Sequence, residues 1–139
     1  MDETDRELIR LLSLDARRPA SELARDLGVS RPTVQNRIDK LKASGAITRF
    51  TIELGDQANG ALIDALVLVK LKPGDSRSVV AQFAKLAGVE AITSSNGAFD
   101  FILELRVSSL QNLDHLLVDI RRMPMVADTN SSIRLNKFK

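Results

Sequence analysis

The feature that most constrains this chain is a joint of three residues between two helical segments near its N-terminus. Gly28-Val29-Ser30 follows a segment predicted to be helical over about residues 19–27 and precedes another over about residues 31–44. Gly28 is suited to end the first helix, and Ser30 is suited to cap the second. Two helices joined by so short a turn containing glycine are typical of a helix-turn-helix. A further helix is predicted before them, over about residues 3–13.

The phase of the helix after Ser30 separates a core side from an outer side. At about 100° per residue, Val34, Ile38 and Leu41 fall together and are expected to face the core. Gln35 and Asn36 then lie on or beside the outer side. Such amide side chains can form paired hydrogen bonds with adenine edges in the major groove of DNA. This helix is therefore predicted to be a recognition helix.

The residues expected to contact DNA lie mostly near the start of that helix, because the N-terminal residues of a recognition helix enter the groove. Between Ser30 and Arg49, five basic side chains face one acidic side chain, a local net charge of +4. Such a cluster is typical of phosphate contacts, although a solvated helix face has the same composition. For Arg37, which is nearer the core, an internal ion pair or a phosphate contact is favoured over base contact. The candidate DNA-binding residues are Ser30, Arg31, Pro32, Thr33, Gln35, Asn36, Arg37, Lys40 and Arg49.

An alternating segment over residues 46–54 predicts a β-strand after this helix. It is interpreted either as the wing of a winged helix-turn-helix, with Thr48 and Arg49 at its edge, or as a linking strand. Residues 55–60 then combine two glycines with Asp and Asn, which favours a boundary. The expected organisation is a DNA-binding domain over residues 1–50, a linker strand and hinge over residues 51–61, and a second domain over residues 62–139.

The second domain is predicted to contain six elements in the order βαββαβ. Strands are expected at about residues 62–71, 89–95, 99–107 and 127–135, and helices at about residues 76–86 and 109–122. This order is that of the ferredoxin-like fold, in which an antiparallel sheet carries both helices on one face. The predicted fold class is therefore α+β, a winged helix-turn-helix joined to a ferredoxin-like domain.

The open face of that sheet is expected to be apolar. If the odd-numbered residues of its first strand face the helices, Leu66 and Leu68 face the opposite side, with Ile102 and Ile92 beside them. An uncovered apolar patch favours a partner surface, and a self-complementary face favours a two-fold homodimer. The alternative is that the linker strand covers the patch.

The pattern of residues 1–50 resembles the DNA-binding domain of the Lrp/AsnC, or feast/famine, regulators. The matching positions are Asp2, Asp5, Leu8, Ile9, Leu12, Ala16, Arg17, Glu22, Leu23, Ala24, Gly28, Val29, Ser30, Thr33, Val34, Arg37, Ile38, Leu41, Gly45 and Ile47. The chain departs from the family at Pro19, where a serine often forms a capping box with Glu22; its loss weakens that helix start by roughly 1 kcal/mol. The resemblance implies a transcription regulator that binds double-stranded DNA and forms homodimers, which assemble into octamers or other higher oligomers.

Residues 94–100 contain Asn96-Gly97, a strong hairpin signal. By the resemblance, Gly97 and Asp100 match a segment near which the family binds small effectors, usually amino acids. The resemblance implies that the Gly97 and Ala98 amides hold an α-carboxylate while Asp100 accepts from an α-ammonium; a hairpin turn alone explains the same residues. The candidate effector-binding residues are Gly97, Ala98, Phe99, Asp100, Met125, Thr129 and Ser131, with Met125 standing where the family often has glycine.

Composition limits the remaining chemistry. The chain has 139 residues, no cysteine, one histidine and a net charge of +2. Disulfides, thiolate nucleophiles and cysteine-based zinc sites are excluded, so no cofactor, metal or catalytic residue is expected, and His115 is placed at the surface or an interface. The longest apolar run, residues 65–69, is far too short to span a bilayer. A cytoplasmic protein without membrane contact is expected.

Two other functions share part of this pattern. The haem-pathway decarboxylases resemble the two-domain arrangement, but they need acid and base groups around a tetrapyrrole. This chain has no tyrosine and no cysteine, so an enzyme is not expected. The second alternative is a regulator without an effector that bridges DNA as an architectural protein.

Overall fold

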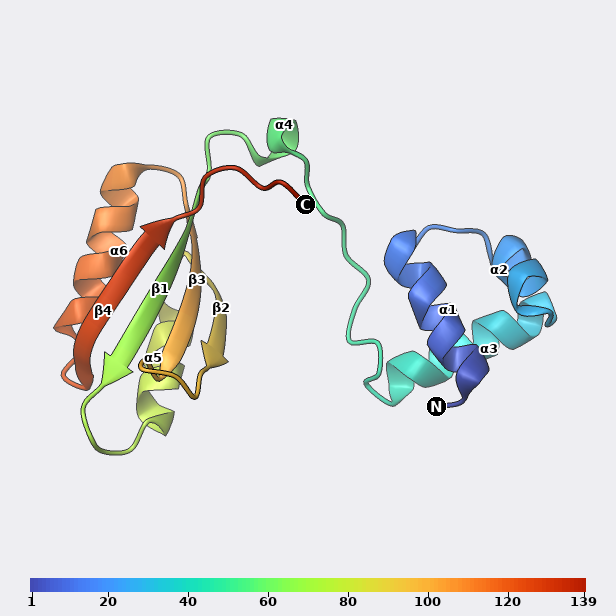
Figure 1. Ribbon diagram of the computed structural model, residues 1–139, viewed down its shortest axis with the longest axis horizontal. Helices are drawn as coiled ribbons and strands as arrows, with labels where there is room; N and C mark the ends of the chain where they lie inside the picture. The colour runs from blue at the N-terminus through green and yellow to red at the C-terminus, as the bar shows by residue number, and fades with distance from the viewer. The chain divides into compact units, whose positions relative to one another are not determined.

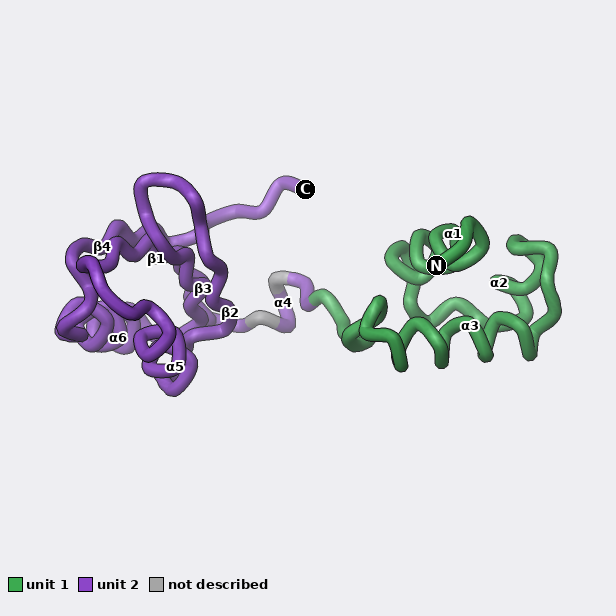
Figure 2. Tube along the Cα trace, turned by 90° about the horizontal axis from the view of Figure 1, so that it is seen from below, with its two compact units in different colours: residues 1–53 green, residues 54–139 purple. Residues whose placement is uncertain are grey.

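The computed structural model describes the backbone of residues 1–139 and the side chains of all of them except Asp56 and Asn59. The chain divides into two compact units, Met1–Glu53 and Leu54–Lys139 (Figure 2). Each unit has a hydrophobic core of its own. The division falls within the segment that the sequence assigned to a linker strand.

Three helices build the first unit: α1 (Glu3–Leu14), α2 (Ala20–Leu27) and α3 (Arg31–Ala43). α1 begins in a capping box, in which Asp2 accepts a hydrogen bond from the Asp5 amide and Asp5 accepts one from the Asp2 amide. Leucines from α1 and α2 pack against the inner side of α3. The buried residues of this core are Leu8, Leu11, Leu12, Leu23, Ala24, Val34 and Leu41.

The joint between α2 and α3 has the predicted form. Gly28 ends α2 with a φ of 65°, in the left-handed region that favours glycine. Ser30 caps α3 and accepts from the Thr33 amide at 3.3 Å. At Pro19 the start of α2 has no side-chain cap, as the sequence indicates. The helix-turn-helix is confirmed.

The strand expected over residues 46–54 is not formed. These residues are all described, and residues 48–55 have no regular structure. Phe50, Ile52 and Leu54 are 45%, 75% and 43% exposed. A strand needs a neighbour for its backbone N–H and C=O groups, and the sheet of the described chain does not include this segment. The expected wing strand was therefore wrong for the single chain.

The second unit is a four-stranded antiparallel sheet in the order β2-β3-β1-β4. Its strands are β1 (Ile63–Leu71), β2 (Val89–Ser94), β3 (Phe101–Val107) and β4 (Val126–Ile133). α5 (Arg77–Lys85) and α6 (Leu110–Arg122) lie on one face of the sheet (Figure 1). This order confirms the predicted ferredoxin-like domain. A short helix that the sequence did not predict, α4 (Asp56–Asn59), precedes it.

The core of this unit lies between the sheet and its helices. Phe83 of α5 is fully buried, and its ring meets Phe101 edge to face with 6.4 Å between centroids. Alternate residues of β1 and β3 point to the same core, as the alternation predicts. The buried residues of β1 and β3 are Ala65, Val67, Val69, Leu103 and Leu105.

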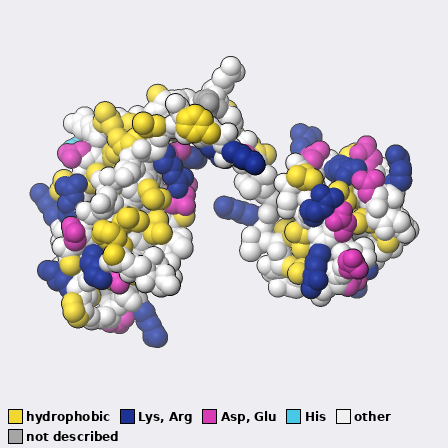
Figure 3. Space-filling model, in the orientation of Figure 1, with side chains coloured by type: hydrophobic (Ala, Val, Ile, Leu, Met, Phe, Trp, Pro, Cys, Tyr) yellow, Lys and Arg dark blue, Asp and Glu magenta, His cyan; other side chains and the backbone are white. Residues whose placement is uncertain are grey.

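The open face of the sheet carries Leu66, Leu68 and Ile102, which are half-buried. Figure 3 shows apolar atoms on this face among charged side chains. Charged pairs flank them: Arg106 donates to Asp64 at 2.7 Å, and Arg134 lies 3.5 Å from Glu104.

Ile92 was expected on this open face, and that expectation was wrong. The register between β2 and β3 shifts between Val89 and Ala91. Ile92 therefore pairs with buried Leu103 and packs against the helix-covered core, because paired residues share one side of a sheet. A bulge of this kind reverses the alternation that sequence analysis relies on.

Candidate DNA interface and ligand site

The outer side of α3 carries most of the side chains expected to contact DNA. On the inner side, Val34 and Leu41 are 0% and 4% exposed, and Ile38 packs against the same core. The predicted core side is therefore confirmed. The exposed candidates on this helix are Arg31, Pro32, Gln35, Asn36 and Lys40.

Two hydroxyl groups are bonded to each other at the start of α3. The Oγ of Ser30 lies 2.7 Å from the Oγ1 of Thr33, and Thr33 is half-buried. Both side chains are thus occupied in capping. Exposed Arg31 follows the cap directly, at a helix end whose free N–H groups and dipole favour anions such as phosphate.

The two amide side chains of α3 differ in what they already bind. Nε2 of Gln35 donates to Oδ1 of Asp39 at 3.1 Å. Asn36 makes no side-chain hydrogen bond within the described part of the chain. Asn36 can therefore bond a base edge directly, whereas Gln35 must exchange one contact to do so.

Arg37 is engaged with the start of α1. Its Nη1 lies 2.8 Å from Oδ2 of Asp2 and 2.7 Å from Oδ1 of Asp5. The hydrogen bond from Arg37, together with that from the Asp5 amide, holds the pKa of Asp2 below its ordinary value. Of the two interpretations left open for Arg37, the internal ion pair is the one present. This cluster connects the N-terminus of α1 with the middle of α3.

Two arginines of the first unit that lie outside α3, Arg49 and Arg18, have different surroundings. Arg49 is exposed in the segment without regular structure and lines a groove with Ile9 and Phe50. Arg18, which the sequence analysis missed, pairs with Glu22 and Asp26 of α2. The spacing of four residues between Arg18 and Glu22 was the available signal. Arg18 therefore joins the α1–α2 connection to α2.

The loop between β2 and β3 lies at the end of β1. The Asp100 amide donates to the Val69 carbonyl at 2.8 Å, and the Asp100 carboxylate accepts through Oδ2 from the Leu71 amide at 2.7 Å. The Gly97 amide donates to Oγ of Ser95 at 3.3 Å. Some of the polar groups expected to bind an effector, in Asp100 and Gly97, therefore already form hydrogen bonds within the chain.

Asp100 lines an open pocket of about 510 Å³ at this end of the sheet. Lys70 and Lys72 line it from the end of β1, and Gly74 lines it from the turn that follows. A carboxylate beside two ammonium groups suits a ligand that carries both charges. The sequence analysis missed the two lysines, although their alternation at the end of a predicted strand was visible.

Met125 lies at the same end of the sheet. Its carbonyl accepts from the Lys72 amide at 2.8 Å. Its side chain packs on Gly74, where an added Cβ would lie 3.0 Å from the Met125 Cε. In the neighbouring loop, Ala98 is exposed and Phe99 is half-buried. Met125 thus borders the pocket of Asp100.

Thr129 and Ser131 are not brought to that pocket. They pair with Val69 and Val67 of β1 and therefore share the side of the sheet that the helices cover. Asp100 precedes Phe101, whose side chain is on the helix side, so alternation directs Asp100 to the other side. Within one chain, Thr129 and Ser131 therefore do not form one site with Asp100.

The described residues also bear on membrane spans and metal clusters. No described helix combines the length and apolarity needed to cross a membrane. The described histidine and acidic side chains form no group of three that could hold a metal ion. His115 is exposed on α6, where the sequence placed it at a surface.

Comparison with known proteins agrees with this geometry. The AsnC-type helix-turn-helix domain matches residues 1–42, and the Lrp/AsnC ligand binding domain matches residues 64–139. The HTH-type transcriptional regulator FL11 of Pyrococcus horikoshii is 30% identical over 139 residues, covering 100% of this chain and 92% of the relative. The structure of E. coli AsnC has a TM-score of 0.84 at 26% identity, covering 100% of this chain and 95% of that one.

A further structural neighbour is the transcriptional regulator NMB0573 of Neisseria meningitidis in complex with L-Met. It has a TM-score of 0.86 at 20% identity, covering 100% of this chain and 92% of that one, and this likeness shows the fold alone. Both domain matches and the alignment of FL11 along the whole chain indicate the same family. This protein belongs to the Lrp/AsnC family of DNA-binding transcriptional regulators.

Proposed function

We propose that this protein regulates transcription in response to an amino acid or a related small metabolite, which alters its oligomeric assembly or its affinity for DNA. The observation that carries the proposal is the exposed side of α3. That side presents Asn36 without a partner among the described residues, while buried Val34 and Leu41 hold the opposite side of α3 in the core and Arg37 forms ion pairs with α1. The effector part rests on the pocket at Asp100.

In this proposal the outer side of α3 lies in the major groove of DNA. Gln35 and Asn36 contact base edges, with Arg31, Pro32 and Thr33 at the groove entrance beside the cap at Ser30. Lys40 and Arg49 neutralise phosphates. Arg37 positions the helix from within the unit.

Selection of bound fragments from genomic DNA tests this assignment. The wild-type protein should enrich a sequence motif, and Asn36→Ala should enrich a motif altered at one or more positions. Gln111→Ala removes an exposed amide from α6 and is the matched control, expected to enrich the wild-type motif. An unchanged motif with Asn36→Ala would show that Asn36 does not contact bases.

The open face of the sheet is proposed to pair with the same face of a second copy. Leu66, Leu68 and Ile102 form its apolar centre, and the pairs Asp64–Arg106 and Glu104–Arg134 neutralise charge around it. Such a face can meet its own copy across a two-fold axis. The dimers are further proposed to assemble into octamers or another higher oligomer.

Light scattering on the purified protein tests the dimer. Leu68→Lys places a charge at the centre of the face in both copies. Because burying each leucine is worth about 1.5–3 kcal/mol, the dissociation constant should rise by roughly a hundredfold or more. Leu110→Lys changes a leucine that is 62% exposed on α6, and it should leave the mass unchanged. A dimer that persists with Leu68→Lys would exclude this face.

The effector is proposed to bind in the pocket at Asp100. Oδ2 of Asp100 is bonded to the Leu71 amide, so the second carboxylate oxygen is the one placed to accept from an α-ammonium. Lys70, Lys72 or the Gly97 and Ala98 amides would hold the α-carboxylate. Phe99 and Met125 border the site, whereas Thr129 and Ser131 lie on the other face of the sheet and are left out.

Thermal unfolding with each of the twenty amino acids tests this site. A ligand present at a hundred times its dissociation constant stabilises the folded protein by about 2.7 kcal/mol. Asp100→Asn should abolish the stabilisation. Asp128→Asn should retain it, since Asp128 lies on β4 opposite Lys70 and does not line the pocket. If none of the twenty stabilises the wild-type protein, a regulator that bridges DNA without an amino-acid effector is favoured instead.

A further inference from the structure

One acidic side chain lies on the exposed side of α3. Asp39 is the only Asp or Glu over residues 30–49. At about 100° per residue, it falls between Gln35 and Asn36 around the helix. It is exposed and forms no ion pair with any described residue. In the proposed function this side of α3 faces DNA, whose phosphates repel a carboxylate. The role inferred here for Asp39 rests on that proposed function.

Asp39 is hydrogen-bonded to Gln35, one helical turn before it. Nε2 of Gln35 donates to Oδ1 of Asp39 at 3.1 Å, and a spacing of four residues suits such a bond between neighbouring turns. An ionised carboxylate only accepts hydrogen bonds, so the amide must turn its nitrogen toward Asp39. The bond therefore orders the two ends of the Gln35 amide, which could otherwise exchange places.

This bond leaves Gln35 with a free acceptor. Oε1 of Gln35 makes no hydrogen bond with a described residue, whereas the N–H group that Asp39 accepts is withdrawn from any base. In the major groove, A and C each present an amino group, and G and T each present a carbonyl oxygen. An acceptor such as Oε1 can bond the amino group of A or C but not the carbonyl oxygen of G or T.

Asn36 differs from Gln35 in having no such partner. Its side chain makes no hydrogen bond within the described part of the chain. Its oxygen and its N–H groups are both free for the paired contact that an amide makes with adenine. The two neighbouring amides of α3 should therefore differ in base preference, with adenine alone favoured by Asn36 and either A or C accepted by Gln35.

We propose that Asp39 is a positioning residue for base recognition. It holds the amide of Gln35 so that Oε1 is offered to the bases, and Gln35 then selects A or C over G or T on the strand that it contacts. Each base pair carries its amino group and its carbonyl oxygen on opposite strands of the major groove. This contact therefore selects the orientation of a base pair. Repulsion between Asp39 and phosphates weakens binding to all sequences alike and adds nothing to this selection.

Selection of bound duplexes from a randomised pool, with the full-length protein, tests the proposal. Gln35→Ala identifies the base-pair position that Gln35 contacts, as the position whose preference is lost. There the wild-type protein should enrich A and C over G and T by about tenfold. Asp39→Ala frees the amide for the paired contact with adenine. It should leave A enriched, and the ratio of C to G should fall about tenfold.

The double variant Gln35→Ala/Asp39→Ala separates positioning from direct contact. Because Asp39 acts through Gln35, the double variant should show the same base preference at this position as Gln35→Ala. A further loss of preference in the double variant would mean that Asp39 contacts a base itself, which would overturn the proposal. A ratio of C to G that Asp39→Ala leaves unchanged, or a wild-type preference that excludes C, would also overturn it.

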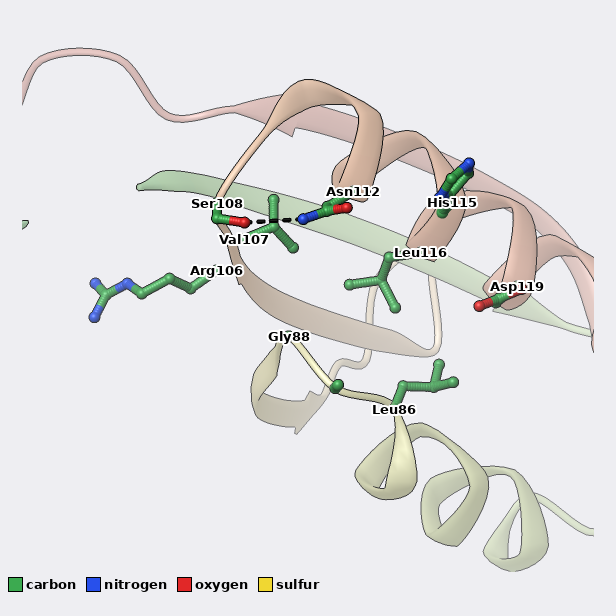
Figure 4. A pocket seen from close by; sticks show the side chains of 10 residues that line it. Leu86, Gly88, Arg106, Val107, Ser108, Asn112, His115, Leu116 and Asp119 are labelled. Atoms are coloured by element: carbon green, nitrogen blue, oxygen red, sulfur yellow. Dashed lines mark hydrogen bonds between the residues drawn. The ribbon is translucent and has the colours of Figure 1, made fainter. Parts of the chain in front are cut away.

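An amide on α6 provides a matched control. Nδ2 of Asn112 donates to Oγ of Ser108 at 2.9 Å over the same spacing of four residues (Figure 4). Ser108→Ala removes this partner in the second unit and should enrich the wild-type motif. A motif that Gln35→Ala leaves unchanged at every position would overturn the proposed contact of Gln35 with bases, and the role of Asp39 with it. A motif altered by Gln35→Ala but not by Asp39→Ala would overturn the role of Asp39 alone.

Discussion

The outer side of α3 and the loop at the end of the sheet differ in how many of their polar groups already form hydrogen bonds within the protein. On α3, Asn36 makes no side-chain hydrogen bond, and Lys40 forms no ion pair with a described residue. In the loop, Asp100 accepts from the Leu71 amide at 2.7 Å and Gly97 donates to Ser95 at 3.3 Å. One surface is left available for a partner, and the other also holds the fold together.

This difference follows from the backbone. A helix bonds its own N–H and C=O groups, so the side chains on its outer side are not needed for that purpose. A loop leaves such groups open, and nearby polar side chains satisfy them. Substitutions on α3 should therefore change DNA binding with little change in stability, whereas substitutions in the loop should change ligand binding and stability together.

The largest expected effects come from the two cores, because each unit is held by its own set of buried residues. Phe83→Ala should lower the free energy of unfolding of the second unit by about 3–5 kcal/mol, and Leu8→Ala that of the first by about 2–5 kcal/mol. Both side chains are 0% exposed. Differential scanning calorimetry should show one transition lowered by each variant. A single transition that shifts equally with either variant would contradict two independent units.

The next effect tests the comparison of loop and helix directly. Asp100→Ala leaves the Leu71 amide without its acceptor, which should cost about 1–3 kcal/mol. Asp100→Asn keeps an oxygen acceptor and should cost less. Asn36→Ala, on the exposed side of α3, should change stability by less than about 0.5 kcal/mol. Chemical denaturation measures all three, and a cost for Asn36→Ala as large as that for Asp100→Ala would refute the distinction.

The smallest effect concerns the ion pairs of Arg37 between α1 and α3. The hydrogen bond from Arg37 lowers the pKa of Asp2 below its ordinary value of 3.8. A lowered pKa in the folded state stabilises the protein at pH values above 3.8, and this stabilisation is lost as the pH falls through the folded pKa. Asp2→Asn retains a good N-cap residue and removes the titrating carboxylate.

Thermal unfolding of the first unit as a function of pH measures this contribution. Wild type should unfold at a higher temperature than Asp2→Asn at neutral pH, and the two should converge as the pH falls below the folded pKa of Asp2. A constant difference over the whole pH range would mean that the ionised carboxylate of Asp2 is not what stabilises the unit.

The parts of the fold that the sequence predicted well are those decided by neighbours in the chain. Gly28 and Ser30 mark the joint through their own conformational and capping preferences, and the alternation of β1 separates Val67 from Leu68 without knowledge of any partner. Helix phase likewise placed Val34 in the core. The ion-pair interpretation of Arg37 depended on the same phase, although its partners Asp2 and Asp5 were not identified.

The parts that the sequence did not predict depend on contacts between distant residues. Residues 46–54 have the alternation of a strand, but a strand also needs a paired neighbour, and the described part of this chain supplies none. Ile92 was misplaced because a bulge shifts the register of β2. Thr129 and Ser131 were grouped with Asp100 by resemblance, whereas strand pairing directs them to the other side of the sheet.

The central claim is that Gln35 and Asn36 on the outer side of α3 contact bases, whereas Lys40 of α3 and Arg49, which follows α3, contact phosphates. Affinity for a selected fragment and for an unrelated duplex, measured over a series of salt concentrations, tests it most directly. Gln35→Ala and Asn36→Ala should lose about 1–3 kcal/mol of discrimination at the affected base pair, with an unchanged salt dependence. Lys40→Ala and Arg49→Ala should weaken binding to both duplexes and lower the salt slope by about 0.9 each. If all four variants lose affinity for both duplexes alike, with the same salt slope, the proposed role of this side of α3 is contradicted.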